Sequence, residues 1–125
     1  MFLRKWGANM KETIKTIMDW HEQTFPDATL NSQLVKYQEE QREWVESGCK
    51  DITELADMFI VACGLARFDI HEGLYALSDV YDWYSGEASL DMTNLIAEVE
   101  EKMKKNRKRD WAKTAEGTYH HTNEE

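Results

Sequence analysis

The sequence predicts an all-α protein, a bundle of four to five helices in a single domain spanning residues 1–125. Apolar residues recur every three or four positions along most of the chain, which is the helical period. The chain has one proline, and no segment alternates apolar and polar residues as a half-buried strand does. We expect the apolar stripes to pack together and contacts between subunits to complete the bundle.

Caps and apolar stripes place the first three helices. A capping box at Asn9 starts the first helix, which ends near Phe25-Pro26. Thr29 caps a second helix that runs to Gly48, and a third spans about Ile52 to Phe68. The stripe of the first helix comprises Ile14, Ile17, Met18 and His21, and that of the second comprises Leu34, Tyr37, Gln41, Trp44 and Val45.

The second half of the chain is expected to form two more helices and an irregular tail. A shorter fourth helix ends at Ser85-Gly86, and a last helix begins at about Ser89 with a basic C-terminal end. Residues 113–125 have no clear pattern and are assigned to the tail. The inward stripes are Leu74, Leu77, Tyr81 and Tyr84 in the fourth helix, and Met92, Leu95, Ile96, Val99 and Met103 in the last.

Charge, hydropathy and cysteine content argue against a nucleic-acid-binding protein, a membrane protein and a zinc protein. The net charge of −9 argues against a nucleic-acid-binding surface, which would need a basic stripe. The longest apolar run is about half a membrane span, and no signal peptide is visible, so we expect no membrane partner. Cys49 and Cys63 fit no zinc spacing. A buried, reduced Cys63 points to the cytoplasm, or to the host cytoplasm if a phage encodes the chain.

Two short acidic clusters are the most informative motifs. Glu40 and Glu43 border the apolar stripe of the second helix together with Lys36, and Glu54 and Asp57 lie three residues apart at the start of the third. Antiparallel packing of these helices would aim all four carboxylates at one spot. Oxygen ligands suit Mg²⁺ or Mn²⁺ better than zinc.

Each cluster also has a simpler interpretation. A glutamate-rich helix face is usually just solvated, and Asp51 with Glu54 fits an N-cap and its capping-box partner. Asp57 fits neither explanation, because it follows the first helical turn and precedes the apolar run from Met58 to Ala66. An unpaired carboxylate at such a position would be costly to bury, and a cation would remove that cost.

The pattern Glu-Glu-x-x-Glu at Glu39–Glu43 followed by Glu-x-x-Asp at Glu54–Asp57 resembles the signature of the MazG-like, all-α nucleoside triphosphate pyrophosphohydrolases. Trp20 with the Phe25–Thr29 segment, and Lys102 to Trp111, resemble the flanks of the dATP/dGTP diphosphohydrolase subgroup. The similarity covers most of residues 14–68 and 95–121. Residues 71–90 depart from the family pattern, because they lengthen the chain between the acidic motif and the Lys/Asn/Arg segment.

The resemblance implies hydrolysis of a nucleoside triphosphate, dATP or dGTP in particular, to the monophosphate and pyrophosphate. It implies Mg²⁺, with Mn²⁺ as a substitute, on Glu40, Glu43, Glu54 and Asp57, and a homodimer or tetramer. Glu43 or Glu39 is the candidate general base. The expected substrate-binding residues are Lys36, Lys102, Asn106 and Arg109 for the phosphates, and Trp20 and Phe25 for the base.

Other functions remain open on the sequence alone. Lys102, Asn106 and Arg109 could form an ordinary solvated helix end, and Trp20 and Phe25 could be core residues. The alternatives are a pyrimidine dNTP pyrophosphatase acting on dUTP or dCTP, a phosphohydrolase for another phosphoanhydride, and a noncatalytic acidic helical binding protein.

Overall fold

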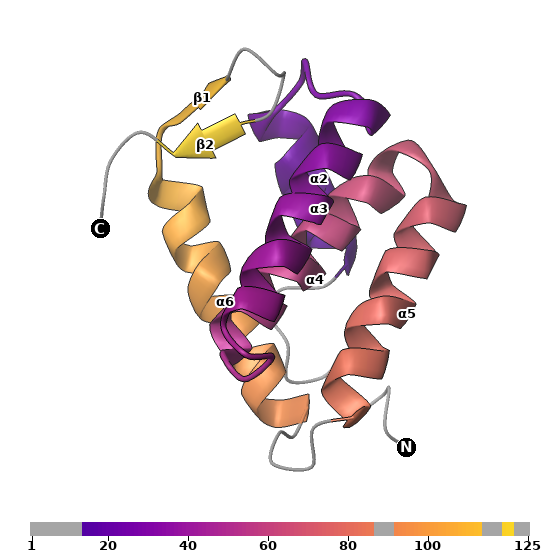
Figure 1. Ribbon diagram of the computed structural model, residues 1–125. Helices are drawn as coiled ribbons and strands as arrows, with labels where there is room; N and C mark the ends of the chain where they lie inside the picture. Colours follow the sequence, from indigo (N-terminus) through magenta and orange to yellow (C-terminus); the bar gives the residue numbers. More distant parts are fainter. Residues whose placement is uncertain (1–13, 87–91, 114–118, 122–125) are drawn as a thin grey trace.

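The computed structural model describes residues 14–86, 92–113 and 119–121, and confirms the all-α prediction (Figure 1). A small antiparallel pair of strands accompanies the helices. The elements are α2 (Ile14–Thr24), α3 (Leu30–Glu46), α4 (Ile52–Phe68), α5 (Ile70–Gly86), α6 (Met92–Lys108), β1 (Trp111–Lys113) and β2 (Tyr119–His121).

Helix α4 is the centre of the bundle, and α2, α3, α5 and α6 all pack against it. Its position follows from its composition, since a helix that is apolar on nearly every side must be covered on nearly every side. Every residue from Ile60 to Ala66 is buried, including the Cys63 thiol that we expected in the core. Figure 1 shows α5 and α6 on opposite sides of the α3–α4 pair.

The α3–α4 connection is fixed by caps and by a tight loop. Thr29 caps α3 as predicted, in a reciprocal capping box with Ser32. The chain leaves α3 through Gly48 and Cys49, both with positive φ, at 79° and 58°. The Asp51 carboxylate then caps α4 by accepting the Thr53 N–H at 3.0 Å. The Asp51 N–H itself lies 3.4 Å from Ser47 Oγ, so Glu54 is not the capping-box partner that its spacing allows.

Helix α5 differs from the sequence prediction in its length and in which face is buried. It is 17 residues long, as long as α3, α4 and α6, rather than short. It begins earlier because the Asp69 carboxylate caps it by accepting the His71 N–H at 2.9 Å. Its buried face contains Gly73, Ala76 and Val80, whereas the large residues Leu74 and Tyr81 of the predicted stripe are exposed.

Small residues explain the orientation of α5. A Cβ atom on Gly73 would collide with Ala66 of α4, so the two backbones approach too closely for a larger residue. Close helix contact through small residues leaves the long side chains of α5 on the outer face. Ile14 and Val45, assigned to apolar stripes of α2 and α3, are likewise exposed because they lie at helix ends.

Helix α6 buries Leu95, Val99 and Met103 as its stripe predicts, and Ile96 is half-buried. The tail after α6 is not wholly irregular, because β1 pairs with β2 in the register Trp111↔His121, Ala112↔His120 and Lys113↔Tyr119. Strands of three residues are too short to show an alternating pattern, so they could not be predicted from the sequence.

Some sequence expectations lie outside the described residues, namely the capping box of Asn9 and Glu12 and the exact start of the last helix near Ser89. Among the described helices, none is long and apolar enough to cross a membrane.

Candidate metal centre and adjoining cavity

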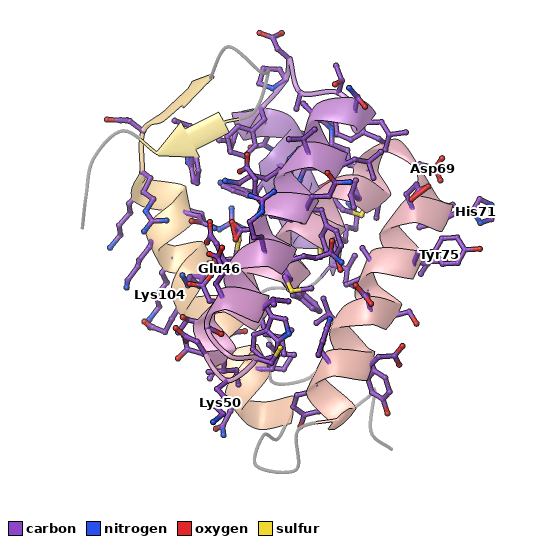
Figure 2. All side chains as sticks on the ribbon, in the orientation of Figure 1. Glu46, Lys50, Asp69, His71, Tyr75 and Lys104 are labelled. Carbon is purple, nitrogen blue, oxygen red and sulfur yellow. The ribbon has the colours of Figure 1, made fainter. Side chains whose placement is uncertain are left out.

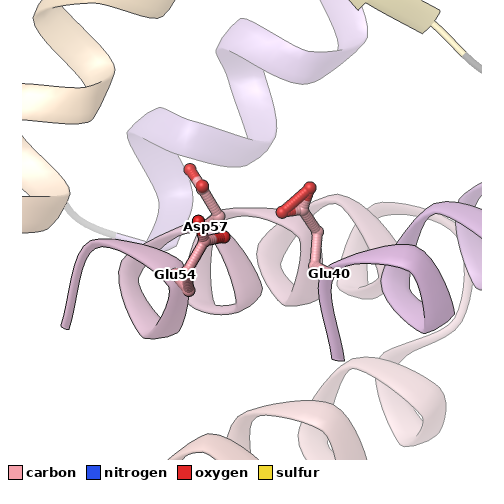
Figure 3. A group of neighbouring side chains, drawn as sticks. All are labelled: Glu40, Glu54 and Asp57. Atoms are coloured by element: carbon pink, nitrogen blue, oxygen red, sulfur yellow. The ribbon is translucent and has the colours of Figure 1, made fainter. Parts of the chain in front are cut away.

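Three of the four predicted carboxylates meet at one point between α3 and α4. Figure 3 shows Glu54 and Asp57 on neighbouring turns of α4, with Glu40 on α3 beside them. Each can offer one oxygen, and these oxygens all lie within 4.8 Å of one another. The convergence follows from helix geometry, because residues three apart share a face and antiparallel packing sets that face against Glu40.

The surroundings of this cluster disfavour negative charge. Burial, followed by repulsion from Asp57, raises the pKa of Glu40 to about 8. Burial and the neighbouring Asp57 and Glu43 carboxylates raise the pKa of Glu54 to about 7. Burial also raises the pKa of Asp57, although Lys102 opposes the shift. Full ionisation of the three carboxylates is therefore costly, and a bound cation would offset that cost.

Two oxygens of the cluster are in the position that a metal ligand would occupy. Glu40 Oε2 and Glu54 Oε2 are buried, and neither has a hydrogen-bond partner within the described part of the chain. Buried polar atoms are nearly always paired, so such atoms need an explanation. Opposite ligands on Mg²⁺ lie about 4.2 Å apart, so a small side-chain adjustment would bring the three carboxylates into coordination distance. The donor set therefore fits a hard divalent cation.

The fourth predicted ligand, Glu43, lies beside the cluster rather than within it. Its side chain is exposed, and it lines the adjoining cavity near enough to Glu54 and Asp57 to raise the pKa of both. It lies one turn after Glu40 on α3, so it is at the solvent side of the same face. Glu43 is thus placed to act on water next to a cation rather than to enclose the cation. Glu39, the other candidate base, is half-buried beside Lys36, with 3.6 Å between its Oε1 and Lys36 Nζ.

Two lysines flank the carboxylates. Lys102 Nζ of α6 donates to Asp57 Oδ2 at 3.1 Å, and Lys36 Nζ of α3 lies 3.9 Å from Glu40 Oε1. Both amines are only about one-quarter exposed, so they are held at the site rather than extended into solvent. In the absence of a metal ion, the lysines partly neutralise the cluster.

A cavity of about 270 Å³ opens directly beside the carboxylates, between α2, α3, α4 and α6. It collects residues that are far apart in the sequence. Besides Glu40, Glu43 and Asp57, the structure places all six predicted substrate-binding residues in its lining: Trp20, Phe25, Lys36, Lys102, Asn106 and Arg109.

The α6 end of the cavity is organised around Asn106. Arg109 Nη1 donates to Asn106 Oδ1 at 3.1 Å, and Trp111 Nε1 donates to the Asn106 carbonyl at 3.2 Å. Arg109 Nε is buried and has no hydrogen-bond partner among the described residues. The guanidinium is therefore oriented by one nitrogen and retains a buried donor that no described protein group satisfies.

The aromatic end of the cavity adjoins Asn106 through Trp111. The rings of Trp20, Phe25 and Trp111 meet edge to face, with centroids 5.3 Å apart for Trp20–Phe25, 5.1 Å for Phe25–Trp111 and 6.1 Å for Trp20–Trp111. Trp20 and Phe25 are also largely buried, so they belong to the core and to the cavity wall together.

Three polar or aromatic residues of the cavity wall were not predicted from the sequence to line a site. Trp111 appeared only as part of a family flank, and its position depends on β1. His21 was assigned to an apolar stripe, and Gln33 has no distinguishing neighbours in the sequence. Both are buried and line the cavity. A polar residue at the buried phase of an amphipathic helix was the available signal for each of them.

Comparisons with models of known protein families, with curated proteins and with solved structures gave no match. The chemistry of the site is therefore argued from its geometry. The cavity wall combines carboxylate oxygens that can bind a cation, the cationic side chains of lysine and arginine, and aromatic rings.

Proposed function

We propose that the protein hydrolyses a nucleoside triphosphate, dATP or dGTP in particular, to the monophosphate and pyrophosphate in a reaction that requires Mg²⁺. The observation that carries this proposal is the single cavity that joins an acidic cluster, a set of cationic side chains and an aromatic end. These three surfaces match the metal-bound phosphates and the base of one nucleotide. The resemblance to the MazG-like pyrophosphohydrolases supports the same reaction.

Glu40, Glu54 and Asp57 would hold the cation, and Glu43 would complete the acidic face of the site. When bound, Mg²⁺ would neutralise phosphate charge and lower the pKa of the attacking water. Mn²⁺ has similar ligand preferences and is the expected substitute. The exposed Glu43 carboxylate is the candidate acceptor for the proton of that water.

Lys36, Lys102 and Arg109 would contact the phosphates. Each lines the cavity and carries a positive charge, which would offset the repulsion between an acidic protein and a triphosphate. Asn106 keeps Arg109 in place through the 3.1 Å hydrogen bond, so its role combines positioning with substrate contact. The planar guanidinium is suited to hold two phosphate oxygens at once.

Trp20 and Phe25, together with Trp111, would enclose the base. Aromatic rings in this arrangement offer faces and edges for stacking, which favours the larger surface of a purine over a pyrimidine. We therefore expect dATP or dGTP to be hydrolysed faster than dCTP or dUTP.

The proposal is tested by incubating the protein with each common NTP and dNTP in Mg²⁺ or Mn²⁺ and identifying the products by ³¹P NMR. Pyrophosphate and a monophosphate are expected, with purine deoxynucleotides giving the highest kcat/KM. Orthophosphate as the first product would overturn the reaction, and a pyrimidine preference would overturn the base assignment. Activity that persists in EDTA would overturn the metal requirement.

We also propose a homodimer in the cytoplasm. The outer face of α5 exposes Ile70, Leu74, Tyr75 and Tyr81, and the nearby Trp83 is 38 % exposed, which is more apolar surface than one helix usually leaves to water. Figure 2 shows Tyr75 projecting away from the bundle. Self-association through a two-fold axis would cover this face. Cys49 and Cys63 are free thiols, as a reducing compartment favours.

A further inference from the structure

The side chain of Arg67 lies outside the cavity but contacts two residues of its wall. Arg67 is near the C-terminal end of α4, where its Nη1 donates to His21 Nδ1 at 2.9 Å and to the Phe25 carbonyl at 3.0 Å. The His21 carbonyl oxygen lies 3.4 Å from the same nitrogen. His21 and Phe25 line the cavity, whereas Arg67 does not. The proposed reaction assigns no role to Arg67.

The hydrogen bonds of Arg67 join α4 to the connection between α2 and α3. The last carbonyls of a helix have no partner within the helix, and a cation is favourable near them. Helix α2 ends at Thr24, so the guanidinium lies at its C-terminal end. The Phe25 carbonyl also accepts the Ala28 N–H at 3.1 Å, which closes the turn that follows α2. Arg67 therefore binds this turn to α4.

Packing fixes the position of the Arg67 guanidinium. Its carbon lies 4.4 Å from the centre of the Phe68 ring, and Phe68 packs edge to face against His21 with centroids 6.0 Å apart. Gly64 precedes Arg67 by about one turn and lets α4 approach α2, because a Cβ there would lie 2.8 Å from His21 Cδ2. The His21 ring is thus held from both sides.

Phe25 is the residue through which Arg67 can affect the aromatic end of the cavity. Its ring lies 5.3 Å from that of Trp20 and 5.1 Å from that of Trp111, closer to each than the two indoles are to one another. Phe25 is only 5 % exposed, so its ring cannot shift without moving its neighbours. A displaced Phe25 backbone would therefore change the shape of the surface proposed for the base.

The proposed metal ligands are distant from Arg67. Asp57 and Arg67 are both on α4, and a rise of about 1.5 Å per residue separates them by about 15 Å along the helix axis. The Lys102 amine is at the Asp57 end of the cavity, because it donates to Asp57 at 3.1 Å. Loss of Arg67 should thus alter the aromatic end and leave the cation end unchanged.

We propose that Arg67 is a positioning residue that holds Phe25 and the following turn against α4, and thereby sets the fit of the base in the aromatic end of the cavity. The proposal rests on the proposed function, because it assumes that a nucleotide base occupies this end. Without Arg67, ligands that carry a base should bind more weakly, whereas a phosphate chain without a base should bind as before.

The test compares dATP with tripolyphosphate, which has three phosphates but no sugar or base. In Arg67→Met, KM for dATP should rise about tenfold, because stacking on aromatic rings contributes much of the binding of a base. The value of kcat should stay within about threefold of the native value, since the cation and its ligands are distant. The inhibition constant of tripolyphosphate in Mg²⁺ should change less than about twofold. An equal loss for both ligands, or an unchanged KM for dATP, would overturn the proposal.

Three further variants separate positioning from general stability. Arg67→Lys keeps a donor for the Phe25 carbonyl and should recover part of the affinity for dATP. Phe68→Leu keeps the arginine but removes the ring beneath it, and should raise KM in the same direction. Val80→Ala truncates a buried residue of α5 that does not line the cavity, so it should lower the melting temperature and keep the native KM. A raised KM in Val80→Ala would assign the effect to lost stability and contradict the proposal.

A spectroscopic readout needs neither hydrolysis nor a ligand. The indole N–H resonances of Trp20 and Trp111 should shift in Arg67→Met, because both rings contact Phe25. The resonance of the buried Trp44, near the C-terminal end of α3, should not shift. Unshifted Trp20 and Trp111 resonances would show that Arg67 does not position Phe25. If the native protein forms no pyrophosphate from dATP, the proposed function fails, and these resonances still decide the role of Arg67.

Discussion

Helices α5 and α6 have the same length and both pack against α4, but of their described residues only those of α6 contribute to the cavity. Both have 17 residues, and both pack on α4 from opposite sides (Figure 1). Helix α6 and the residue that follows its end bring Lys102, Asn106 and Arg109 to the cavity, whereas no described residue of α5 lines it. The outer face of α5 instead exposes large apolar side chains.

The difference shows that the size of a helix's buried residues sets how closely the helix packs against its neighbour. Helix α6 buries the long side chains of Leu95, Val99 and Met103, and this spaces it from α4 and leaves room for polar groups between them. Helix α5 approaches α4 closely at Gly73, which meets Ala66, and Ala76 is also buried. Substitutions in the cavity and substitutions on other surfaces, including α5, should therefore have different effects.

The largest effect is expected from Asp57→Asn. Asp57 is both a proposed metal ligand and the partner of Lys102, so its amide should reduce kcat/KM by more than about 100-fold while leaving the helices intact. Asp82→Asn, which alters an exposed carboxylate of α5, is the matched control and should retain native activity. Steady-state kinetics and circular dichroism test the pair. Near-native hydrolysis by Asp57→Asn would show that the proposed metal site is wrong.

Mg²⁺ should raise the thermal stability of the protein, by about 3 kcal/mol at a concentration 100 times its dissociation constant. Glu40→Gln should abolish this gain. It should also stabilise the metal-free protein at pH 8, because the raised pKa of Glu40 means that folding costs more as pH rises from 4.5 to about 8.

Glu46→Gln removes the same charge from the exposed surface of α3 (Figure 2) and is the control for Glu40→Gln. It should preserve the response to Mg²⁺. Melting curves in EDTA and in Mg²⁺ compare the two variants. An equal Mg²⁺ response in Glu40→Gln and in the native protein would exclude Glu40 as a ligand.

His21 should make the protein less stable in acid. Its pKa is about 4 in the folded chain and 6.5 without the fold, so between these values the unfolded state binds more protons. Stability should be intact above pH 6.5 and fall by up to about 3 kcal/mol as pH drops to 4. Urea unfolding of native protein and of His21→Gln would measure this difference.

The α5 counterpart for this experiment is His71, which is exposed and projects from the bundle (Figure 2). His71→Gln should reproduce the native pH profile. If His21→Gln shows the same loss of stability in acid as the native protein, then another group is responsible for it.

Lys102→Met should have opposite effects on the binding of Mg²⁺ and on the binding of the triphosphate. Removing the amine that neutralises Asp57 leaves this carboxylate free for a cation, so Mg²⁺ should bind more tightly without nucleotide. At the same time, KM for the triphosphate should rise by about tenfold, since a charged hydrogen bond contributes about 1.5–3 kcal/mol. Calorimetry and kinetics give the two values. Lys104→Met, on the exposed face of α6, should change neither, and weaker Mg²⁺ binding in Lys102→Met would contradict the idea.

The smallest effect on folding is expected from Leu74→Glu. A carboxylate in the middle of the exposed α5 face should dissociate the proposed dimer and change the stability of the protomer by less than about 0.5 kcal/mol. Asn94→Glu adds the same charge to an exposed position on α6 and should leave the dimer intact. Light scattering at micromolar concentration distinguishes them, and a native monomer would contradict the proposed assembly.

The helical class, the α3 and α4 boundaries and the acidic cluster could be predicted from the amino-acid sequence. These are local properties. Thr29 caps α3 through a residue three positions away, and the i, i+3 spacing sets Glu54 and Asp57 on one face. Lys102 and Asn106 share a face of α6 for the same reason, and Arg109 follows just after the helix, so their common position in the cavity was also predictable from spacing.

The buried face of α5, the pairing of β1 with β2 and the polar residues of the cavity depend on contacts between elements and could not be predicted from local sequence. The burial of small residues in α5 depends on Ala66 of another helix, and the position of Trp111 depends on β1 and on its hydrogen bond to Asn106. Hydrogen bonds that run from Arg67 of α4 through His21 of α2 to Gln33 of α3 join three helices. These hydrogen bonds join residues 46 and 12 positions apart, and helical periodicity carries no information over such separations.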